Sequence, residues 1–285
     1  MRQATGPGAP FETLFDEQPA IGQPLDGAFG SIYGRWDLPE VGERPYTYIN
    51  FVTSRDGRVS FNEPGKSSGG PISGNSRHDR WLMALLRARA DAVLIGASAL
   101  AYAPRQTWSA GAIFPDDEQT WKELRQVERR APLPLHVVVT RSGEVRAESP
   151  VITDPNVPAL IVSTDAGIRK VREQIGEAPN VALLELGASI DYQRLGLVLA
   201  HEHHIRTLLS EAGPQVYAAL LQAGVVHDEF ITLSPIIVGS SSEKPRPSLA
   251  EGVAFAPDEP PRSCLLSVRR AGDLLFLHSR YQYEP

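Results

Sequence analysis

The chain has 285 residues, which suits one large α/β domain or two small ones and allows a core that needs no disulfide. Its formal net charge of −6 gives no broad basic field for nucleic acid, and its single cysteine, Cys264, excludes an internal disulfide and a cysteine-rich metal site. No apolar run approaches membrane-spanning length and the first residues lack an apolar signal core, so we expect a cytoplasmic protein that binds neither nucleic acid nor membrane.

Residues 1–44 are rich in proline and glycine, with scattered aromatic side chains. We predict that they form an N-terminal extension that packs onto the next domain rather than a domain of their own. Residues 45–285 are then one domain. Phe11, Phe15 and Trp36 are available to cover either this domain or a partner subunit.

Regular patterns begin at residue 46. The apolar and turn-forming residues predict a buried strand over 46–53, a short return strand over 58–61, a helix over 76–89 and a strand over 92–95. The helix is indicated by apolar side chains that recur on one side, and a polar, glycine-rich loop over 62–74 precedes it.

Strands and helices then alternate. Helices are predicted over 117–130, 166–174, 190–200 and 216–223, and strands over 135–139, 159–162, 181–184 and 205–209. Late strands are predicted over 229–234, 264–270 and 274–283, with a long surface loop over 239–262. This order implies a mostly parallel sheet with helices on both faces and antiparallel edge strands.

The stretch Glu211-Ala212-Gly213-Pro214-Gln215-Val216 joins a strand to a helix. A helix start offers unpaired backbone N–H groups and a positive dipole end to a phosphate. Gly213 allows close approach of the backbone, and Pro214 suits the first helical position. The alternative is a plain tight turn between strand and helix.

Two further strand ends carry small or phosphate-binding residues. Gly96-Ala97-Ser98 allows a cofactor to lie close to the backbone, or else contains a packing glycine. Thr140-Arg141-Ser142 combines a guanidinium with two hydroxyls, which suits a 2′-phosphate as well as the start of an ordinary loop.

Two carboxylates are candidates for acid catalysis. Asp56 lies in a Ser-Arg-Asp-Gly turn and Asp79 in the first turn of the helix over 76–89, so each also has a plain structural explanation. An acid at the mouth of a sheet can protonate a substrate during reduction. The cluster over 201–204 (His-Glu-His-His) is more typical of a solvated helix end than of a metal site, and we expect no metal.

Several of these stretches occur in a fixed order that resembles one family. The matching residues are Ser54-Arg55-Asp56-Gly57, then Leu86-Arg87, Asp91-Ala92 and Gly96, then Glu211-Ala212-Gly213-Pro214, then Asp228-Glu229 and the stretch 235–239. The chain resembles the reductase domain of the bifunctional deaminase–reductase of riboflavin biosynthesis, here expected to stand alone. The resemblance implies a dihydrofolate-reductase-like fold, a three-layer sandwich around the predicted sheet.

The resemblance also implies function. It indicates an NADPH-dependent reductase acting on a small molecule, a pyrimidine-like or pterin-like heterocycle or an opened ribosylamine, as a 5-amino-6-(5-phosphoribosylamino)uracil reductase does. The adenosine 2′-phosphate is then expected near Arg141 and its neighbours, and the nicotinamide near Gly96, Ala97 and Ser98. The pyrophosphate is expected near Gly213, Pro214, Gln215, Val216 and Tyr217.

Other site roles follow from the same resemblance. Glu211 and Arg87 are expected to bind the substrate, although an ion pair on the helix surface would explain Arg87 equally well. Asp79 stands about where dihydrofolate reductases carry their pterin-binding acid, and we expect it to bind and protonate the substrate in preference to Asp56. The family commonly pairs subunits through a sheet edge, so a homodimer formed by the late strands is expected.

The sequence also departs from the family. Tyr102-Ala103 stands where the family carries an acidic pair, and the neighbouring arginine is shifted or lost. Three alternatives therefore remain open: a dihydrofolate-reductase-like activity, a non-catalytic nucleotide-binding module of the same fold, or an unrelated nucleoside-phosphate transferase that uses the same phosphate turn.

Overall fold

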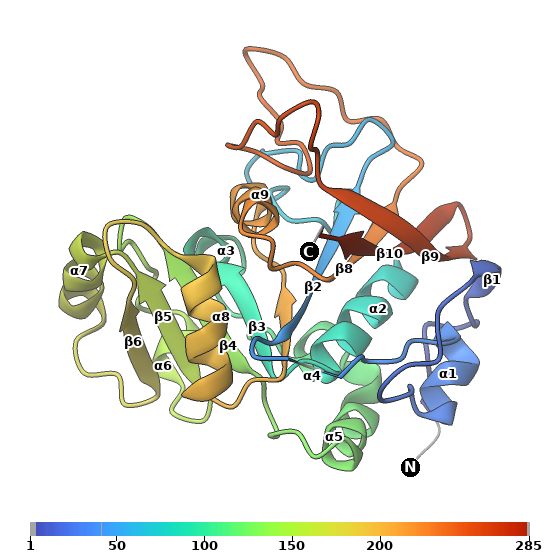
Figure 1. The fold of residues 1–285 in the computed structure, drawn as a ribbon, viewed down its shortest axis with the longest axis horizontal. Helices are drawn as coiled ribbons and strands as arrows, with labels where there is room; N and C mark the ends of the chain where they lie inside the picture. Colours follow the sequence, from blue (N-terminus) through green and yellow to red (C-terminus); the bar gives the residue numbers. More distant parts are fainter. Residues whose placement is uncertain (1–3, 41, 284–285) are drawn as a thin grey trace.

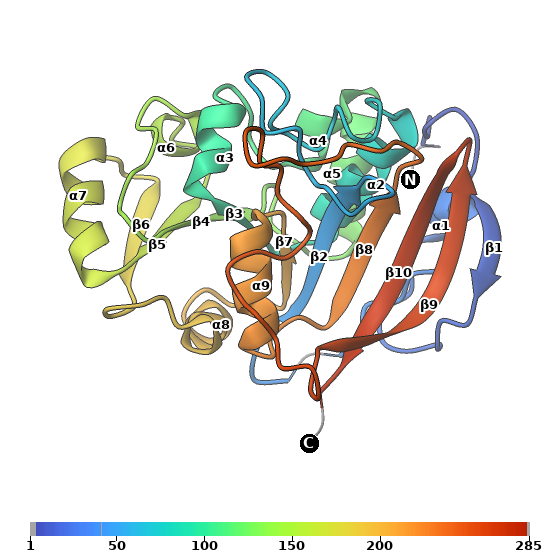
Figure 2. The same ribbon diagram turned by 90° about the horizontal axis from the view of Figure 1, so that it is seen from above.

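A ten-stranded sheet forms the centre of the molecule. The computed structural model describes residues 4–40 and 42–283, and helices cover both faces of the sheet (Figures 1 and 2). The strands lie in the order β1-β9-β10-β8-β2-β7-β3-β4-β5-β6. None of the helices in the described ranges is long and apolar enough to cross a membrane.

The run from β8 through β2, β7, β3, β4 and β5 to β6 is parallel throughout, and β10, β9 and β1 extend it with antiparallel pairs. The predicted mostly parallel sheet with antiparallel strands at one side is confirmed. The strands are β1 (Glu12–Asp16), β2 (Tyr46–Thr53), β3 (Ala92–Gly96), β4 (Leu135–Thr140), β5 (Ala159–Ser163), β6 (Val181–Glu185), β7 (Thr207–Ser210), β8 (Asp228–Leu233), β9 (Arg262–Ala271) and β10 (Leu274–Gln282).

The helices divide between the two faces. Figure 2 shows α8 and α9 on one face of the sheet and α2, α4 and α5 on the other. The helices are α1 (Gly27–Tyr33), α2 (Arg77–Ala88), α3 (Ala97–Tyr102), α4 (Ala110–Ile113), α5 (Glu118–Val127), α6 (Pro150–Thr153), α7 (Asp165–Ile175), α8 (Tyr192–His201) and α9 (Pro214–Gln222), with a 3-10 turn, η1 (Pro115–Asp117).

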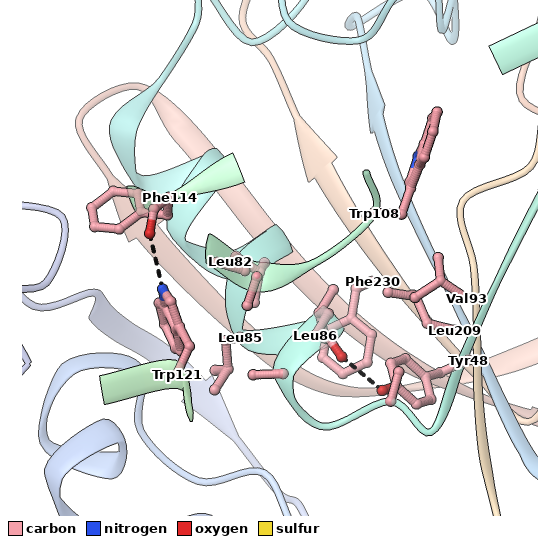
Figure 3. Close-up of a cluster of buried hydrophobic side chains, with 14 of the residues drawn as sticks. Tyr48, Leu82, Leu85, Leu86, Val93, Trp108, Phe114, Trp121, Leu209 and Phe230 are labelled. Atoms are coloured by element: carbon pink, nitrogen blue, oxygen red, sulfur yellow. Dashed lines mark hydrogen bonds between the residues drawn. The ribbon is translucent and has the colours of Figure 1, made fainter. Parts of the chain in front are cut away.

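Helix α2 has local and tertiary reasons to form. The Ser76 hydroxyl accepts a hydrogen bond from the Asp79 backbone N–H, which caps the helix start. Leu82, Leu85 and Leu86 are buried in the core between helix and sheet (Figure 3). The Tyr48 hydroxyl donates a 2.8 Å hydrogen bond to the Leu86 carbonyl, so the even-numbered residues of β2 face α2.

The predicted return strand over 58–61 is wrong. Arg58 instead forms an isolated bridge with Ser248, and the Val59 N–H donates to the Pro247 carbonyl. The pairing partner lies almost 200 residues away along the chain, in the loop after β8, so a local pattern could not indicate it. The short elements β1, α1, α3, α4 and α6 were not predicted either.

The N-terminal residues pack onto their own chain. Phe11, Phe29, Tyr33 and Trp36 are buried in the core that also contains α2 and α5. Two buried arginines hold the segment: Arg89 donates to the Trp36 and Gln23 carbonyls, and Arg269 donates to Asp16 and to the Arg35 carbonyl. These contacts place the segment inside the folded unit.

The N-terminal strand also changes the edge of the sheet. β1 pairs with β9 over Ser267–Arg270, with Glu12 opposite Arg270, whereas Arg262–Leu265 of β9 is registered only with β10. The expectation that the late strands present an edge to a partner is therefore narrowed to the first half of β9, where it stays a prediction. The described sheet ends at β1 on one side and at β6 on the other.

We predict that Phe29→Ala lowers the free energy of unfolding by about 3–5 kcal/mol, because it removes a buried ring from the core. The Phe29 ring is fully buried and stacks on Trp121 with ring centroids 5.1 Å apart. Leu14→Ala, at a side chain that is 50% exposed, is the control and should change stability by less than about 0.5 kcal/mol. Urea unfolding measures both, and equal small effects would place the N-terminal segment outside the cooperative unit.

Candidate active site

A cleft of about 1270 Å³ opens at the carboxyl ends of β3 and β4 and the start of α9. Its lining includes Gly96, Ala97 and Ser98 after β3, Thr140, Arg141 and Ser142 after β4, and Gln215 and Val216 in the first turn of α9. Stretches predicted from separate parts of the sequence thus meet in one cleft. In parallel sheets, the carboxyl ends of strands are where ligands bind.

The turn before α9 leaves room for a ligand to approach its backbone closely. Gly213 is the N-cap and Pro214 the first helical residue, and the Gly213 carbonyl accepts from the N–H groups of Val216 and Tyr217. A Cβ built on Gly213 would meet nothing within 4 Å, so there is room beside this backbone. This arrangement fits an anion at the helix start.

Three predicted cofactor residues do not line the cleft: Gly213, Pro214 and Tyr217. Gly213 and Pro214 shape the turn. The Tyr217 side chain is buried, and its hydroxyl donates to Glu229 at 2.8 Å and bonds to the Tyr281 hydroxyl at 2.7 Å. Only the backbone of Tyr217 belongs to the turn.

The loop after β4 depends on a glycine and leaves a guanidinium available. Gly143 has φ +78°, and a Cβ there would lie 2.1 Å from the Gly167 carbonyl oxygen, so glycine is required. The Thr140 hydroxyl accepts from the Gly143 N–H and caps the turn. Within the ranges that the structure describes, the Arg141 side chain forms no salt bridge, which leaves its charge free for an anionic ligand.

Sequence reasoning missed part of the cleft wall. Tyr192, at the start of α8, lines the cleft, and burial raises the pKa of its hydroxyl to about 12. Glu251, Gly252 and Val253 come from the long loop after β8, which folds back so that the Glu251 N–H donates to the Pro214 carbonyl. The serine- and proline-rich composition of that loop carries no signal of this return.

Asp79 lies on α2, on the side that faces the sheet. Its side chain is 4% exposed, and burial raises the pKa of its carboxyl. The nearby Thr232 and Ser73 hydroxyls lower that pKa, whereas the charge of Glu211 raises it further. A raised carboxyl pKa is what a proton donor near neutral pH requires.

Arg87 and Glu211 bind each other. Arg87 Nε lies 2.8 Å from Glu211 Oε1 and Arg87 Nη2 lies 2.6 Å from Glu211 Oε2, with both side chains buried. Arg87 also donates to the Ser109 carbonyl at 3.3 Å. An ion pair was the alternative explanation of Arg87, and this geometry agrees with it. The pair is not on the helix surface, however: it is buried and joins α2 to the end of β7.

Asp56 is held in its turn. Its carboxylate accepts from the N–H groups of Val238 and Gly239 and from the Ser54 hydroxyl. Hydrogen bonds from Val238, then from Ser54, lower the pKa of Asp56 to about 2. It is therefore ionised at neutral pH, and the geometry favours a turn role over proton donation.

The histidine cluster lies at the end of α8. His201 is the last helical residue, and His203 and His204 follow in the turn before β7. In the part of the chain that the structure describes, no group of three or more His, Cys, Asp or Glu side chains is arranged to hold a metal.

Residues 45–261 match the family model of the RibD C-terminal domain, which is most of the chain. The chain belongs to this family. A curated relative, the 2,5-diamino-6-ribosylamino-4(3H)-pyrimidinone 5′-phosphate reductase of Archaeoglobus fulgidus, is 27% identical over 218 residues, covering 74% of this chain and 89% of the relative.

Solved structures share the fold of this RibD C-terminal domain. A pyrimidine reductase-like protein of Corynebacterium diphtheriae superimposes with a TM-score of 0.64 at 20% identity, covering 84% of this chain and 93% of that one. A diaminohydroxyphosphoribosylaminopyrimidine deaminase/5-amino-6-(5-phosphoribosylamino)uracil reductase of Thermotoga maritima gives 0.58 at 18% identity, covering 84% and 57%. The dihydrofolate-reductase-like architecture predicted from the sequence is confirmed as the fold of this family's reductases.

Proposed function

We propose that this protein is a nicotinamide-dependent reductase of a ribosylamino-pyrimidine 5′-phosphate. The observation that carries the proposal is the cleft in which the stretches after β3 and β4 meet the first turn of α9. Membership of the RibD C-terminal domain family and the name of the Archaeoglobus relative support the substrate class.

The cleft residues fit a dinucleotide. The first turn of α9 at Gln215 and Val216 suits a pyrophosphate, and the unpaired guanidinium of Arg141 suits a second phosphate, which favours NADPH over NADH. Gly96, Ala97 and Ser98 form the small-residue wall on the nicotinamide side. When bound, the nicotinamide supplies a hydride to a polarised C=N or C=O carbon of the opened ribosylamine.

The chain's own residues orient the substrate and supply a proton. Asp79 is the favoured proton donor because burial raises its pKa, whereas the Asp56 carboxylate is already satisfied by backbone N–H groups. The Arg87–Glu211 pair positions α2 against the phosphate turn rather than binding substrate with either partner alone. Each reduction then consumes one hydride and one proton.

Arg141→Ala should weaken NADPH binding by about 1–3 kcal/mol and leave NADH binding nearly unchanged, because only NADPH carries the 2′-phosphate. Titration calorimetry with both dinucleotides measures the difference. Arg146→Ala is the matched control, because Arg146 lines the same cleft but is paired with Glu148 at 3.8 Å. Equal losses for the two dinucleotides in Arg141→Ala would reject this placement.

Asp79→Asn should lower kcat by about 10²–10⁴-fold with little change in NADPH affinity, because it removes the titrating proton and keeps the shape. Asp56→Asn should retain most of kcat. Steady-state rates of both variants with the diaminopyrimidinone substrate provide the measurement. An active Asp79→Asn together with an inactive Asp56→Asn would reverse the assignment.

We also propose a homodimer, in which the exposed sheet face of the late strands takes part. Ile231 on β8 and Leu277 on β10 are registered neighbours on one face of the sheet and only half-buried, as are Leu233 and Leu275. Leu265 on β9 is 44% exposed, and apolar surface of this kind favours association. Light scattering at micromolar concentration should give twice the chain mass, and a monomer would contradict the proposal.

A further inference from the structure

A second cavity, of about 90 Å³, lies where α8 meets α9, the two helices on one face of the sheet (Figure 2). Its inner wall is apolar and buried, and is formed by Leu94, Leu195, Leu208, Leu220 and Val225. Gln193 Nε2 donates a 2.9 Å hydrogen bond to the Ala223 carbonyl, which joins the start of α8 to the end of α9 beside the cavity. Protein cores are closely packed, so a space of this size calls for an explanation.

The mouth of this cavity carries a positive charge. Arg44 and His227 line the cavity but are exposed, so they lie where it opens to solvent. Desolvation lowers the pKa of the His227 imidazole, and the Arg44 charge is close enough to lower it further. Among the described residues, Arg44 has no salt-bridge partner, so its charge is unpaired at this opening.

Both side chains at the mouth have hydrogen-bond donors to offer. The Thr47 N–H donates to His227 Nδ1 at 3.0 Å, which places the proton of a neutral imidazole on Nε2. Within residues 4–40 and 42–283, neither this Nε2–H nor the Arg44 guanidinium has a hydrogen-bond acceptor. A guanidinium and an imidazole N–H together can bind both oxygens of one carboxylate.

Helix α8 accommodates Arg44 at a glycine. Gly196 lies in the interior of α8, where glycine is less favourable than alanine. A Cβ built on Gly196 would lie 3.3 Å from Arg44 Cδ and 3.4 Å from Arg44 Cγ, closer than most such contacts. The absence of a side chain thus lets the aliphatic part of Arg44 lie against the helix, beside the cavity that it lines.

An apolar interior behind a positively charged mouth suits an aliphatic carboxylate. The mouth offers one full charge and one neutral N–H, which matches a single negative charge better than the larger charge of a phosphate monoester. An apolar cavity of about 150 Å³ holds a benzene ring, so 90 Å³ leaves room for a tail of about three or four carbon atoms.

We propose that this cavity binds a short-chain aliphatic monocarboxylate, with the carboxylate on Arg44 and His227 and the apolar tail between α8 and α9. The inference does not depend on the proposed reductase activity. Of the described residues, only Tyr192 lines both this cavity and the larger cleft proposed for the cofactor. Arg44→Gln should therefore leave NADPH binding unchanged, which keeps the tests of the two proposals separate.

The first test is titration of the full-length protein with sodium butyrate, followed by NMR, against sodium chloride at the same ionic strength. We expect saturable binding in the millimolar range, because so small a ligand gains little beyond the cost of association. Affinity should rise about fourfold per methylene from acetate to butyrate and stop rising beyond pentanoate, when the cavity is full. Absence of saturable binding, or a rise that continues to octanoate, would overturn the inference.

The charge at the mouth is tested with butyramide, which has the same tail and no charge. Butyramide should bind at least about tenfold more weakly than butyrate, and Arg44→Gln should remove most of that difference. Arg206→Gln is the matched control, because Arg206 is exposed and its carbonyl accepts from the Tyr46 N–H at the start of β2, but it does not line the cavity. Equal losses of butyrate affinity in the two variants would show a general surface-charge effect and contradict the proposal.

Two further variants test the shape of the cavity. Val225→Leu adds a methylene to the inner wall, and it should weaken butyrate about three- to tenfold while acetate changes little. Gly196→Ala displaces the aliphatic part of Arg44, and it should weaken both carboxylates without lowering Tm, because alanine favours the helix. Thermal unfolding checks that both variants are folded. Butyrate binding that is unchanged in both would place the ligand elsewhere and overturn the proposal.

The His227 imidazole reports on the bound carboxylate directly. A carboxylate nearby favours the charged form, so butyrate should raise the pKa of His227, whereas butyramide should not. The other charges that act on this ring, those of Asp228, Arg280 and Arg44, are present in both titrations. His227→Gln identifies the resonance in the NMR spectrum. An unchanged His227 pKa at saturating butyrate would overturn the placement of the carboxylate.

Discussion

The buried ion pair between Arg87 and Glu211 is the contact on which the arrangement of the site depends. It joins the last part of α2 to the residue that follows β7, with two hydrogen bonds of 2.8 and 2.6 Å. Removing one partner of a buried pair leaves the other charge uncompensated, which typically costs about 3–5 kcal/mol. The pair therefore fixes the helix relative to the strand end where the phosphate turn begins.

That constraint connects the two halves of the proposed site. Glu211 directly precedes Ala212 and Gly213, so whatever holds Glu211 also holds the start of α9. On the other side of the pair, α2 runs from the ion pair back to Asp79 in its first turn. The helix thus sets the distance between the cleft proposed for the cofactor and the carboxyl proposed as proton donor, and hydride transfer needs such fixed positions.

The topology explains why these groups meet at one edge of the sheet. Parallel strands bring the ends of β2, β3, β4 and β7 to the same side, and helices that follow them begin there. Helices on both faces leave the strand ends as the place where backbone N–H groups and polar side chains reach a common space (Figure 2). The fold explains where a ligand site forms, whereas the chemistry of the site depends on its individual side chains.

Much of this arrangement could be predicted because the signals were local. The strand at residues 46–53, the helix capped by Ser76 and the turn at Gly213 each carry their own periodicity or capping chemistry. The contacts that complete the site are not local. Arg87 and Glu211 are 124 residues apart, and the Glu251 loop and the Arg58–Ser248 bridge depend on where distant segments return. Burial of Asp79 beside the Thr232 hydroxyl is likewise visible only once α2 and β8 are placed together.

We propose that the chain reduces a ribosylamino-pyrimidine 5′-phosphate with a nicotinamide cofactor. The most direct measurement is the absorbance of NADPH on addition of the diaminopyrimidinone substrate, with mass spectrometry of the product. We expect steady cofactor consumption and a product that has gained two hydrogen atoms, with one equivalent of product for each NADPH oxidised. If calorimetry shows that NADPH and the diaminopyrimidinone substrate both bind but no NADPH is consumed, the proposed activity is wrong. The protein would then be a nucleotide-binding module without catalysis.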